Sequence, residues 1–381
     1  MRILAVTGTR ADWGLLAPVL ACLRDDARFD LRLAATGQHL MAGSPSLEAI
    51  AAEGFAVDHL VDMGLGPDDS ARALTRASGA ALSGFADVLA GDTPDLMLVL
   101  GDRYEILAAV FAALMAGVPV AHLCGGDLTE GAMDDAIRHA ITKMSALHFT
   151  SNAEAAQRVR QMGEDPAHVF DVGSPGLDRI RQIPLMTRAE VLDDLGLPAP
   201  QGPVFVVTFH PVTLGDGGMA ECRAMLDALD TFPEATLIMT GSNADPGAQA
   251  VDRMVTGYAG ARANAVHRAS LGSRRYFSAL AMSDAVIGNS SSGLYEAPSF
   301  SVPTVNIGDR QGGRLRGPSV IDCAPERDAI VAAIRAALAM DCSGMANPYG
   351  DGHSAARIVA ELARIDTPRA LARKSFRDIP A

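Results

Sequence analysis

The feature that most restricts the fold of this chain is a repeated alternation of short apolar runs with amphipathic segments. Many of the runs end at a glycine or a small polar residue, and segments with helical periodicity lie between them. Strands that alternate with helices in this way are typical of βαβ units, which build parallel, doubly wound sheets. In the first half we predict strands at residues 2–7, 30–36, 96–100, 118–123, 146–150 and 169–172.

The alternation restarts in the second half, with predicted strands at residues 204–208, 236–240, 265–267, 285–287 and 304–307. A chain of 381 residues is too long for one ordinary core, but it suffices for two α/β domains of about 150–200 residues each. The predicted fold class is therefore α/β, with two Rossmann-like domains and an interdomain cleft. We expect these domains at residues 1–182 and 183–352, and a C-terminal helix and tail, 353–381, packed back on the N-terminal domain.

Charge and hydropathy exclude some classes of partner. The 32 Lys and Arg residues against 45 Asp and Glu residues give a net charge of −13, which argues against binding to nucleic acid or to anionic membranes. The stretch 106–123 is almost wholly apolar, but Gly117 and Pro119 interrupt it. We interpret it as a buried helix followed by a buried strand rather than as a membrane span.

The cysteines indicate the compartment. Five are scattered along the chain without a CxxC pair, so neither a disulfide framework nor a zinc site is indicated. The apolar run at the N-terminus reaches a polar turn at Thr7-Gly8-Thr9 too soon for a signal peptide. We therefore expect a cytoplasmic protein.

Polar motifs follow the predicted strands of the first half, at the ends where doubly wound folds bind ligands. A glycine turn and Arg10 precede a helix after the first strand, which suits an anion, although an ordinary βα turn is the alternative. The motif is not GxGxxG, so a nicotinamide or flavin site is not indicated. Asp102 follows the strand 96–100 and points into the expected cleft, unless Arg103 holds it in a structural ion pair.

The next glycine-rich loop carries Asp127 and leads into a helix with an apolar stripe at Ile137, Ile141 and Met144. Asp134 and Arg138 lie beside this stripe, so they are partly buried and their i,i+4 spacing predicts an ion pair. The alternative for Asp134 is a carboxylate that the helix dipole favours at a helix start.

In the second half, His210 follows a strand, although a lone histidine is as often simply solvated or capped. Three serines, Ser290, Ser291 and Ser292, open a helix after the strand 285–287 and form an anion cradle, most simply for a diphosphate. Serine N-capping explains one of them more easily than three. Glu296, one turn later, is within reach of a ribose. Further positive charge is expected from Arg310 and Arg314.

An ordered set of motifs runs through the chain: TGTRADWG, GDR, HLCGGDLTEGAMDDAIRHAITKMSALHF, VGSPGLD, TFHP, GNSSSGLYEAPSF and VNIGDRQGGR. As a set it closely resembles the hydrolysing UDP-N-acetylglucosamine 2-epimerases, which supply N-acetylmannosamine or bacillosamine-derived relatives to sialic-acid-like nonulosonate synthesis. The resemblance implies a glycosyltransferase-B-like fold, a UDP-sugar substrate held mainly by the second domain, neither metal nor other cofactor, and a homodimer or homotetramer.

The resemblance also implies roles for individual residues. The residues expected to contact nucleotide or diphosphate are Arg10, Arg103, His210, Asn243, Ser290, Ser291, Glu296 and Arg310. Those expected around the sugar are Asp102, Asp127 and Asp134, with Asp12, His39 and Arg138 nearby. The chain departs from the pattern at Cys124, where some relatives have an acid, and at Asp127, where many have Glu. Asp127 is one methylene shorter than Glu, so the acid–base group on its face of the sugar has a shorter reach than in those relatives.

The expected reaction expels UDP with removal of the C2 proton, which gives a glycal-like intermediate, and then returns a proton to C2 and adds water at C1. Acid–base groups and positive charge suit these steps, and the expected catalytic residues are Asp102, Asp127, Asp134 and His210. The substrate is UDP-N-acetylglucosamine or a 2,4-diacetamido-6-deoxy analogue. The alternatives are a non-hydrolysing 2-epimerase, a glycosyltransferase of similar fold and a UDP-sugar-binding protein without activity.

Overall fold

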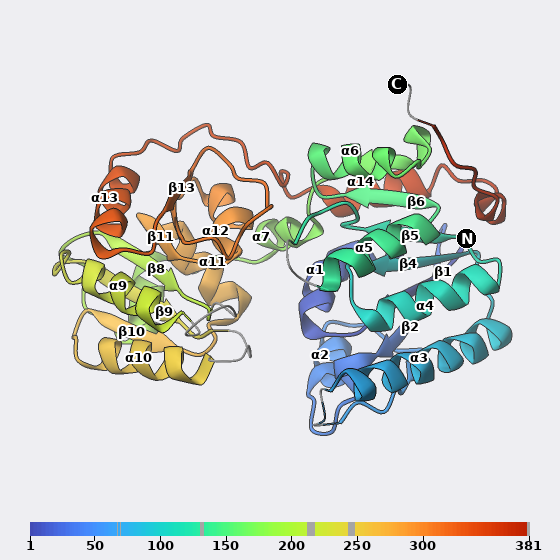
Figure 1. Ribbon diagram of the computed structural model, residues 1–381, viewed down its shortest axis with the longest axis horizontal. Helices are drawn as coiled ribbons and strands as arrows, with labels where there is room; N and C mark the ends of the chain where they lie inside the picture. Colours follow the sequence, from blue (N-terminus) through green and yellow to red (C-terminus); the bar gives the residue numbers. More distant parts are fainter. Residues whose placement is uncertain (67, 69, 130–132, 212–217, 243–247, 379–381) are drawn as a thin grey trace. The chain divides into compact units, whose positions relative to one another are not determined.

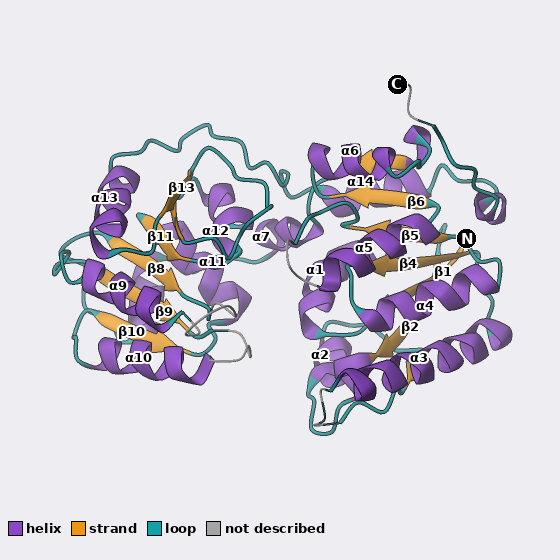
Figure 2. Ribbon diagram, viewed as in Figure 1, coloured by secondary structure: helices purple, strands orange, loops and turns teal. Residues whose placement is uncertain are grey.

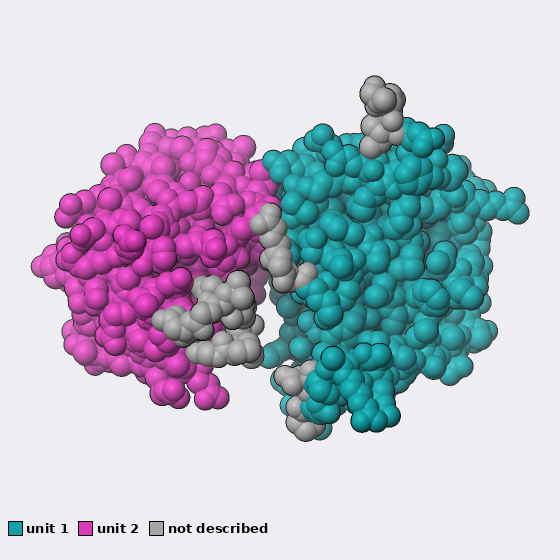
Figure 3. All heavy atoms as spheres, viewed as in Figure 1, with its two compact units in different colours: residues 1–179, 349–381 teal, residues 180–348 magenta. Residues whose placement is uncertain are grey.

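The computed structural model describes residues 1–66, 68, 70–129, 133–211, 218–242 and 248–378. The chain forms two compact units (Figure 3). Unit 1 consists of Met1–Arg179 and Tyr349–Ala381, and unit 2 is the continuous segment Ile180–Pro348. Unit 1 is therefore completed only when the chain returns to it after unit 2.

Unit 1 contains a seven-stranded sheet in the order β3-β2-β1-β4-β5-β6-β7 (Figure 1). The strands pair in parallel, and most of their residues are buried because helices cover both faces of the sheet (Figure 2). Their bounds are β1 Arg2–Thr7, β2 Asp30–Thr36, β3 His59–Val61, β4 Leu96–Leu100, β5 Val120–Leu123, β6 Leu147–Thr150 and β7 Val169–Asp171.

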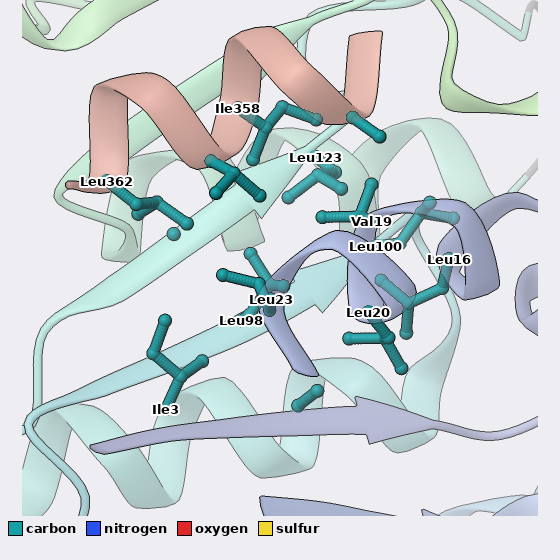
Figure 4. Close-up of a cluster of buried hydrophobic side chains, with 14 of the residues drawn as sticks. Ile3, Leu16, Val19, Leu20, Leu23, Leu98, Leu100, Leu123, Ile358 and Leu362 are labelled. Carbon is teal, nitrogen blue, oxygen red and sulfur yellow. The ribbon is translucent and has the colours of Figure 1, made fainter. Parts of the chain in front are cut away.

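The helices that begin in unit 1 are α1 Arg10–Arg24, α2 Ser46–Ala52, α3 Ala71–Gly91, α4 Tyr104–Met115, α5 Met133–Met144, α6 Ala153–Gln161, α7 Asp178–Gln182 and α14 Ser354–Leu362. Short 3₁₀ turns occur at Gly37–Leu40, Pro166–His168, Pro175–Leu177 and Pro368–Ala372. One face of the sheet packs against α1 and α14. Figure 4 shows Leu20 and Leu23 of α1 among side chains of the strands, with Ile358 and Leu362 of α14 above them.

Unit 2 contains a six-stranded sheet in the order β10-β9-β8-β11-β12-β13, again paired in parallel. Its strands are β8 Val204–Thr208, β9 Thr236–Thr240, β10 Ala265–Arg268, β11 Ala285–Gly288, β12 Thr304–Ile307 and β13 Val320–Cys323. Its helices are α8 Arg188–Leu195, α9 Met219–Leu229, α10 Ala248–Gly260, α11 Gly272–Met282, α12 Ser292–Tyr295 and α13 Arg327–Leu338, with a 3₁₀ turn at Ala297–Phe300.

Both sheets reverse their strand order beside their first strand. The reversal lies between β1 and β4 in unit 1, and between β8 and β11 in unit 2. At such a switch point the loops that follow the two strands turn to opposite faces, which leaves a crevice at the carboxyl end of the sheet. The loops after β1, β4, β8 and β11 are therefore the places where this fold presents side chains to a ligand.

The predicted pair of Rossmann-like sheets is confirmed, and every predicted strand is present with small differences at its ends. Two strands, β3 and β13, were not predicted. Both lie at a sheet edge and carry polar residues, His59 and Asp322, so neither gives a buried apolar run. The apolar stretch 106–123 is confirmed as most of α4 followed by β5. Across the described residues, no helix combines the length and hydropathy needed to cross a membrane.

Candidate functional site

The loop after β1 in unit 1 is shaped by buried polar residues. Thr9 caps α1, and the Asp12 carboxylate accepts hydrogen bonds from the Gly8 and Thr9 amides, each at 2.8 Å. The Thr7 hydroxyl bonds the His39 Nε2 atom at 2.9 Å. Asp12 and His39 are thus buried supports of the loop. Arg10, on the first turn of α1, is exposed and available to an anion.

Glu105 lies directly beneath this loop and was not predicted. It is fully buried, and a Cβ on Gly8 would come within 2.6 Å of its Oε1 atom, so a larger residue there would displace the Glu105 side chain. Its partner is Arg103, whose Nε atom lies 2.6 Å from Oε1. Burial raises the pKa of Glu105, and Arg103 opposes the shift. The alternative that Arg103 pairs with Asp102 is therefore wrong. The sequence did carry a signal for Glu105, because it is a charged residue at the start of an apolar helix.

Arg138 of α5 joins the loops after β4 and β5. Its buried guanidinium donates to the Asp102 carboxylate, to the Asp127 carbonyl at 2.7 Å and to the Thr129 hydroxyl at 2.9 Å. It also forms an ion pair with Asp135 at 3.4 Å. The predicted ion pair of Arg138 with Asp134 is wrong, because Arg138 faces the loops at the strand ends whereas Asp134 is exposed at the start of the helix.

Asp102 and Asp134 differ in electrostatic environment. The Asp102 carboxylate forms an ion pair with the buried guanidinium of Arg138. Partial desolvation and, second, the negative charge of Asp102 raise the pKa of Asp134. Two neighbouring carboxyl groups with such different surroundings are suited to different roles, one as a base and one as an acid.

The loop that carries Asp127 is fastened to the start of α6. The Asp127 carboxylate accepts from the Ser151 hydroxyl at 2.8 and 2.9 Å and from the Asn152 amide at 3.1 Å. Asn152 is also the N-cap of α6. These two residues were not predicted, although a Ser-Asn pair directly after a strand was a usable signal. Asp127 is thus oriented by several donors at the carboxyl end of the sheet.

Two further residues shape the same region of unit 1. His122 of β5 donates from Nε2 to the Gly101 carbonyl at 2.8 Å and contacts the Thr142 hydroxyl through Nδ1 at 3.1 Å. Burial lowers the pKa of His122 to about 3, so the ring stays neutral and holds the backbone beside Asp102. Cys124 has a φ of 61°, which is strained for a non-glycine residue. Burial raises the pKa of its thiol, which therefore stays protonated.

In unit 2, the ends of β8 and β11 approach each other closely. A Cβ on Gly288 would lie 1.9 Å from the Thr208 carbonyl oxygen, and the φ of Gly288 is 135°, so this position requires glycine. The His210 amide donates to the Asn289 Oδ1 atom at 2.7 Å, and Asn289 Nδ2 donates back to the His210 carbonyl at 2.9 Å. The loops that carry His210 and the three serines are thereby joined.

These loops border a pocket of about 420 Å³ within unit 2. Four predicted residues line it: His210, Ser290, Ser292 and Glu296. Tyr276 and Thr240 also line it and were not predicted. Ser291, Arg310 and Arg314 lie in the adjoining loops, where Arg310 Nη1 donates to the Asn289 carbonyl at 3.3 Å and Arg314 Nη1 donates to the Gln311 side chain at 2.8 Å. Asn243 lies outside the described residues.

Three polar residues that line this pocket, Tyr276, Ser292 and Glu296, are linked by hydrogen bonds. The Tyr276 hydroxyl bonds the Ser292 hydroxyl, which lies one turn before Glu296. Burial raises the pKa of Glu296 to about 7, and hydrogen bonding from Ser292 limits the rise. Glu296 therefore exchanges its proton near neutral pH. Within the part of the chain that the structure describes, no group of three His, Cys, Asp or Glu side chains is arranged to hold a metal ion.

Comparison of the sequence with known proteins gives extensive matches. The model of the UDP-N-acetylglucosamine 2-epimerase family matches residues 21–363. The polysialic acid biosynthesis protein P7 of Escherichia coli is 39% identical over 336 residues, which are 87% of this chain and 85% of that protein. The UDP-N,N'-diacetylbacillosamine 2-epimerase (hydrolyzing) of Legionella pneumophila is 36% identical over 362 residues, 93% of this chain and 94% of that protein.

A third relative, the GDP/UDP-N,N'-diacetylbacillosamine 2-epimerase (hydrolyzing) of Campylobacter jejuni, is 36% identical over 326 residues, which are 84% of each chain. Among solved structures, the UDP-GlcNAc 2-epimerase of Neisseria meningitidis bound to UDP-GlcNAc matches with a TM-score of 0.75 at 19% identity, over 96% of this chain and 100% of that one. The S. aureus MnaA–UDP structure matches with a TM-score of 0.77 at 18% identity over 100% of both chains. The sequence matches show that the chain belongs to the UDP-N-acetylglucosamine 2-epimerase family.

Proposed function

We propose that this protein is a hydrolysing 2-epimerase of UDP-N-acetylhexosamines. It converts UDP-N-acetylglucosamine, or a 2,4-diacetamido-6-deoxy analogue, to the free 2-epimeric sugar and UDP. Membership of the family and the names of its relatives support this reaction class. The observation in the structure that carries the proposal is the ion pair of Asp102 with the buried Arg138 at the carboxyl end of the unit 1 sheet, with Asp134 at the start of the helix that carries Arg138.

The reaction begins with elimination. A base takes the proton from C2, the C1–O bond breaks, and its electron pair leaves with UDP while a C1=C2 double bond forms. Water then adds at C1 and a proton returns to C2 on the opposite face, which inverts that centre. General acid–base groups near the sugar and positive charge or N–H groups near the departing diphosphate lower the barriers to these steps.

The surroundings of the carboxyl groups support distinct roles around the sugar. Asp102, held by its ion pair with Arg138, acts as a base, and Asp134, with its raised pKa, returns a proton. Asp127 belongs to the same set, with its carboxylate oriented by Ser151 and Asn152. His210, which lines the pocket of unit 2, donates to the departing phosphate.

The nucleotide end of the substrate is assigned to unit 2. Glu296 binds the ribose, and the serine loop with Arg310 and Arg314 binds the diphosphate, with Arg10 and Arg103 as additional cations. We further propose that the protein acts in the cytoplasm as a homodimer or homotetramer. Its five cysteines are free, which suits a reducing compartment.

The proposal is tested by Asp102→Asn, which keeps the shape of the side chain but removes the base. The variant is incubated with UDP-N-acetylglucosamine and with a diacetamido analogue in deuterated water, and NMR follows UDP release and deuterium at C2. Both rates should fall by about 10²–10⁴-fold. The matched control is Asp95→Asn, at the opposite end of β4, where the carboxylate accepts from the Arg2 amide at 2.8 Å; it should retain wild-type rates.

Near-wild-type rates in Asp102→Asn would remove this residue from the catalytic set. The same NMR assay on the wild-type protein distinguishes between the reaction classes. A non-hydrolysing epimerase exchanges the C2 hydrogen but returns intact UDP-sugar, and a glycosyltransferase leaves C2 unexchanged. A binding protein binds UDP-sugar but breaks neither the C2–H bond nor the bond between C1 and UDP.

A further inference from the structure

Asn289 connects three loops at the carboxyl end of the unit 2 sheet. Its side-chain amide holds the backbone of His210, after β8, by two hydrogen bonds of 2.7 and 2.9 Å. Its own carbonyl, at the start of the serine loop after β11, accepts from Gln311 Nε2 at 2.7 Å and from Arg310 Nη1 at 3.3 Å. Gln311 and Arg310 belong to the loop after β12.

Burial makes these contacts specific. Asn289 and Gln311 are 0% and 1% exposed, so neither side chain has water as an alternative partner. The main-chain amide of Asn289 also donates to the Thr208 carbonyl at 3.2 Å, and the Gln311 side chain in turn accepts from Arg314 at 2.8 Å. A buried amide that lost one of these partners would leave a polar atom unsatisfied. The side chain and the main-chain carbonyl of Asn289 therefore fix the three loops relative to one another.

We propose that Asn289 is a positioning residue for the reaction, which acts on the departing diphosphate through His210 and Arg310 without touching the substrate. The inference rests on the proposed function, since His210 and Arg310 are assigned to the diphosphate there. Groups that stabilise a leaving group must be held in place before the bond breaks, because an error of about 1 Å in their position costs about 10²-fold in rate. Asn289 supplies this restraint to both.

The test uses Asn289→Asp, which keeps the acceptor for the His210 amide and removes the donor to the His210 carbonyl. An ionised carboxylate there faces a carbonyl oxygen at close range, whereas a protonated carboxyl has an O–H that restores the lost hydrogen bond. Burial raises the pKa of a carboxyl introduced at this site above its usual value of about 3.9. The activity of the variant relative to wild type should therefore depend on pH.

UDP release is measured for both proteins between pH 5.5 and pH 8.5. At the upper end Asn289→Asp should lose about tenfold to hundredfold in kcat/KM, and the ratio to wild type should rise as pH falls. The matched control is Asn264→Asp, directly before the edge strand β10 and therefore at the amino end of the same sheet. Its side-chain amide bonds the Pro233 and Ala235 carbonyls at 2.9 and 2.8 Å. The control should keep a ratio independent of pH.

If the ratio of kcat/KM between Asn289→Asp and wild type does not change with pH, the inference is overturned. A variant that is only less stable contains less folded protein, but its folded fraction keeps the pH profile of wild type. Circular dichroism checks folding at each pH. If Asn289→Asp does not fold, Gln311→Met tests the second contact. It removes the donor to the Asn289 carbonyl and should lower kcat/KM about tenfold, and wild-type activity there overturns the inference.

A wild-type protein without turnover contradicts the proposed function but still permits the test. In that case the affinity for UDP alone is measured by calorimetry for the same variants over the same pH range. Weaker binding by Asn289→Asp that recovers at low pH supports the positioning role. A pH-independent ratio of affinities overturns it.

Discussion

Glu296 contributes a titratable group to the pocket of unit 2. Its carboxyl lies one turn beyond Ser292, which in turn bonds the Tyr276 hydroxyl. Because burial raises the pKa of Glu296 to about 7, the folded protein holds this proton more tightly than the unfolded chain, in which the pKa is 4.5. A carboxylate there gains hydrogen-bond donors when a diol binds, so the proposed ribose contact would be strongest above neutral pH.

The pKa shift of Glu296 predicts a pH-dependent stability. Folded and unfolded states bind the proton equally below pH 4.5, and the folded state loses stability as pH rises from 4.5 through 7. Glu296→Gln removes this effect, so the free energy of unfolding of the variant should gain about 3 kcal/mol on wild type between pH 4 and pH 8. Urea titrations at several pH values measure it.

The control for this prediction is Glu326→Gln, at an exposed position before α13. It reports the background effect of exchanging glutamate for glutamine. A stability difference for Glu296→Gln that is constant with pH would contradict the raised pKa.

The same variant, Glu296→Gln, should bind UDP about tenfold more weakly, because an amide replaces a charged acceptor for the ribose hydroxyls.

At the scale of elements, the C-terminal tail after α14 is fastened to unit 1 by a buried carboxylate. Lys374 donates to the Lys143 and Ser145 carbonyls at 2.7 and 2.6 Å and pairs with Glu164 at 2.6 Å. Glu164 also bonds Lys143 and His148, at 2.8 and 3.0 Å. Burial alone would raise the pKa of Glu164, but these three hydrogen bonds lower it to about 2.

Lys374→Met should therefore lower the free energy of unfolding by about 1–3 kcal/mol at pH 7, because it leaves a buried carboxylate with fewer donors. A carboxyl group with a depressed pKa stabilises the fold above its unfolded pKa of 4.5, and this contribution is lost as pH falls toward 2. The difference in the free energy of unfolding between Lys374→Met and wild type should therefore shrink as pH falls from 4.5 toward 2. Urea unfolding at pH 7 and pH 3 measures it.

The tail also offers a matched control in Arg373→Met, at the exposed neighbouring position. This variant removes the same charge and should leave stability within about 0.5 kcal/mol of wild type. Equal losses in the two variants would show that net charge, rather than the contact with Glu164, stabilises the tail.

At the scale of the whole molecule, the two units differ in how they are closed. The cores of unit 2 draw their buried members from residues 191–337, all within one continuous segment. One core of unit 1 combines Leu16, Leu20 and Leu23 of α1 with Ile358 and Leu362 of α14 (Figure 4). Unit 1 therefore buries this face only with a segment that follows unit 2 in the sequence.

This difference predicts the behaviour of fragments. Residues 180–348 expressed alone should fold cooperatively, because their cores are complete. Residues 1–179 should expose the α1 face and aggregate, and a chain that joins residue 179 to residue 349 through a short linker should be soluble. Circular dichroism and NMR spectra of the three fragments measure these outcomes. A cooperatively folded fragment 1–179 would show that α14 is dispensable.

Much of the fold was predictable because buried parallel strands are apolar on both faces. The runs at 96–100 and 204–208 are strands for this reason, and both are central in their sheets. The edge strands β3 and β13 were missed, since a strand with one neighbour and polar residues lacks that signal. The ordered motifs predicted a family that the comparisons confirm.

The sequence by itself determined the kinds of side chain at the strand ends, because the apolar pattern locates those ends and the residues that follow can be read directly. Which side chains meet was decided by the tertiary structure. Arg138 pairs with Asp102, 36 residues away, and not with Asp134 on its own helix. Asn289 bonds His210 across 79 residues. Such partners are chosen by the strand order of the sheet, which brings distant loops together, and spacing along the chain carries no record of that order.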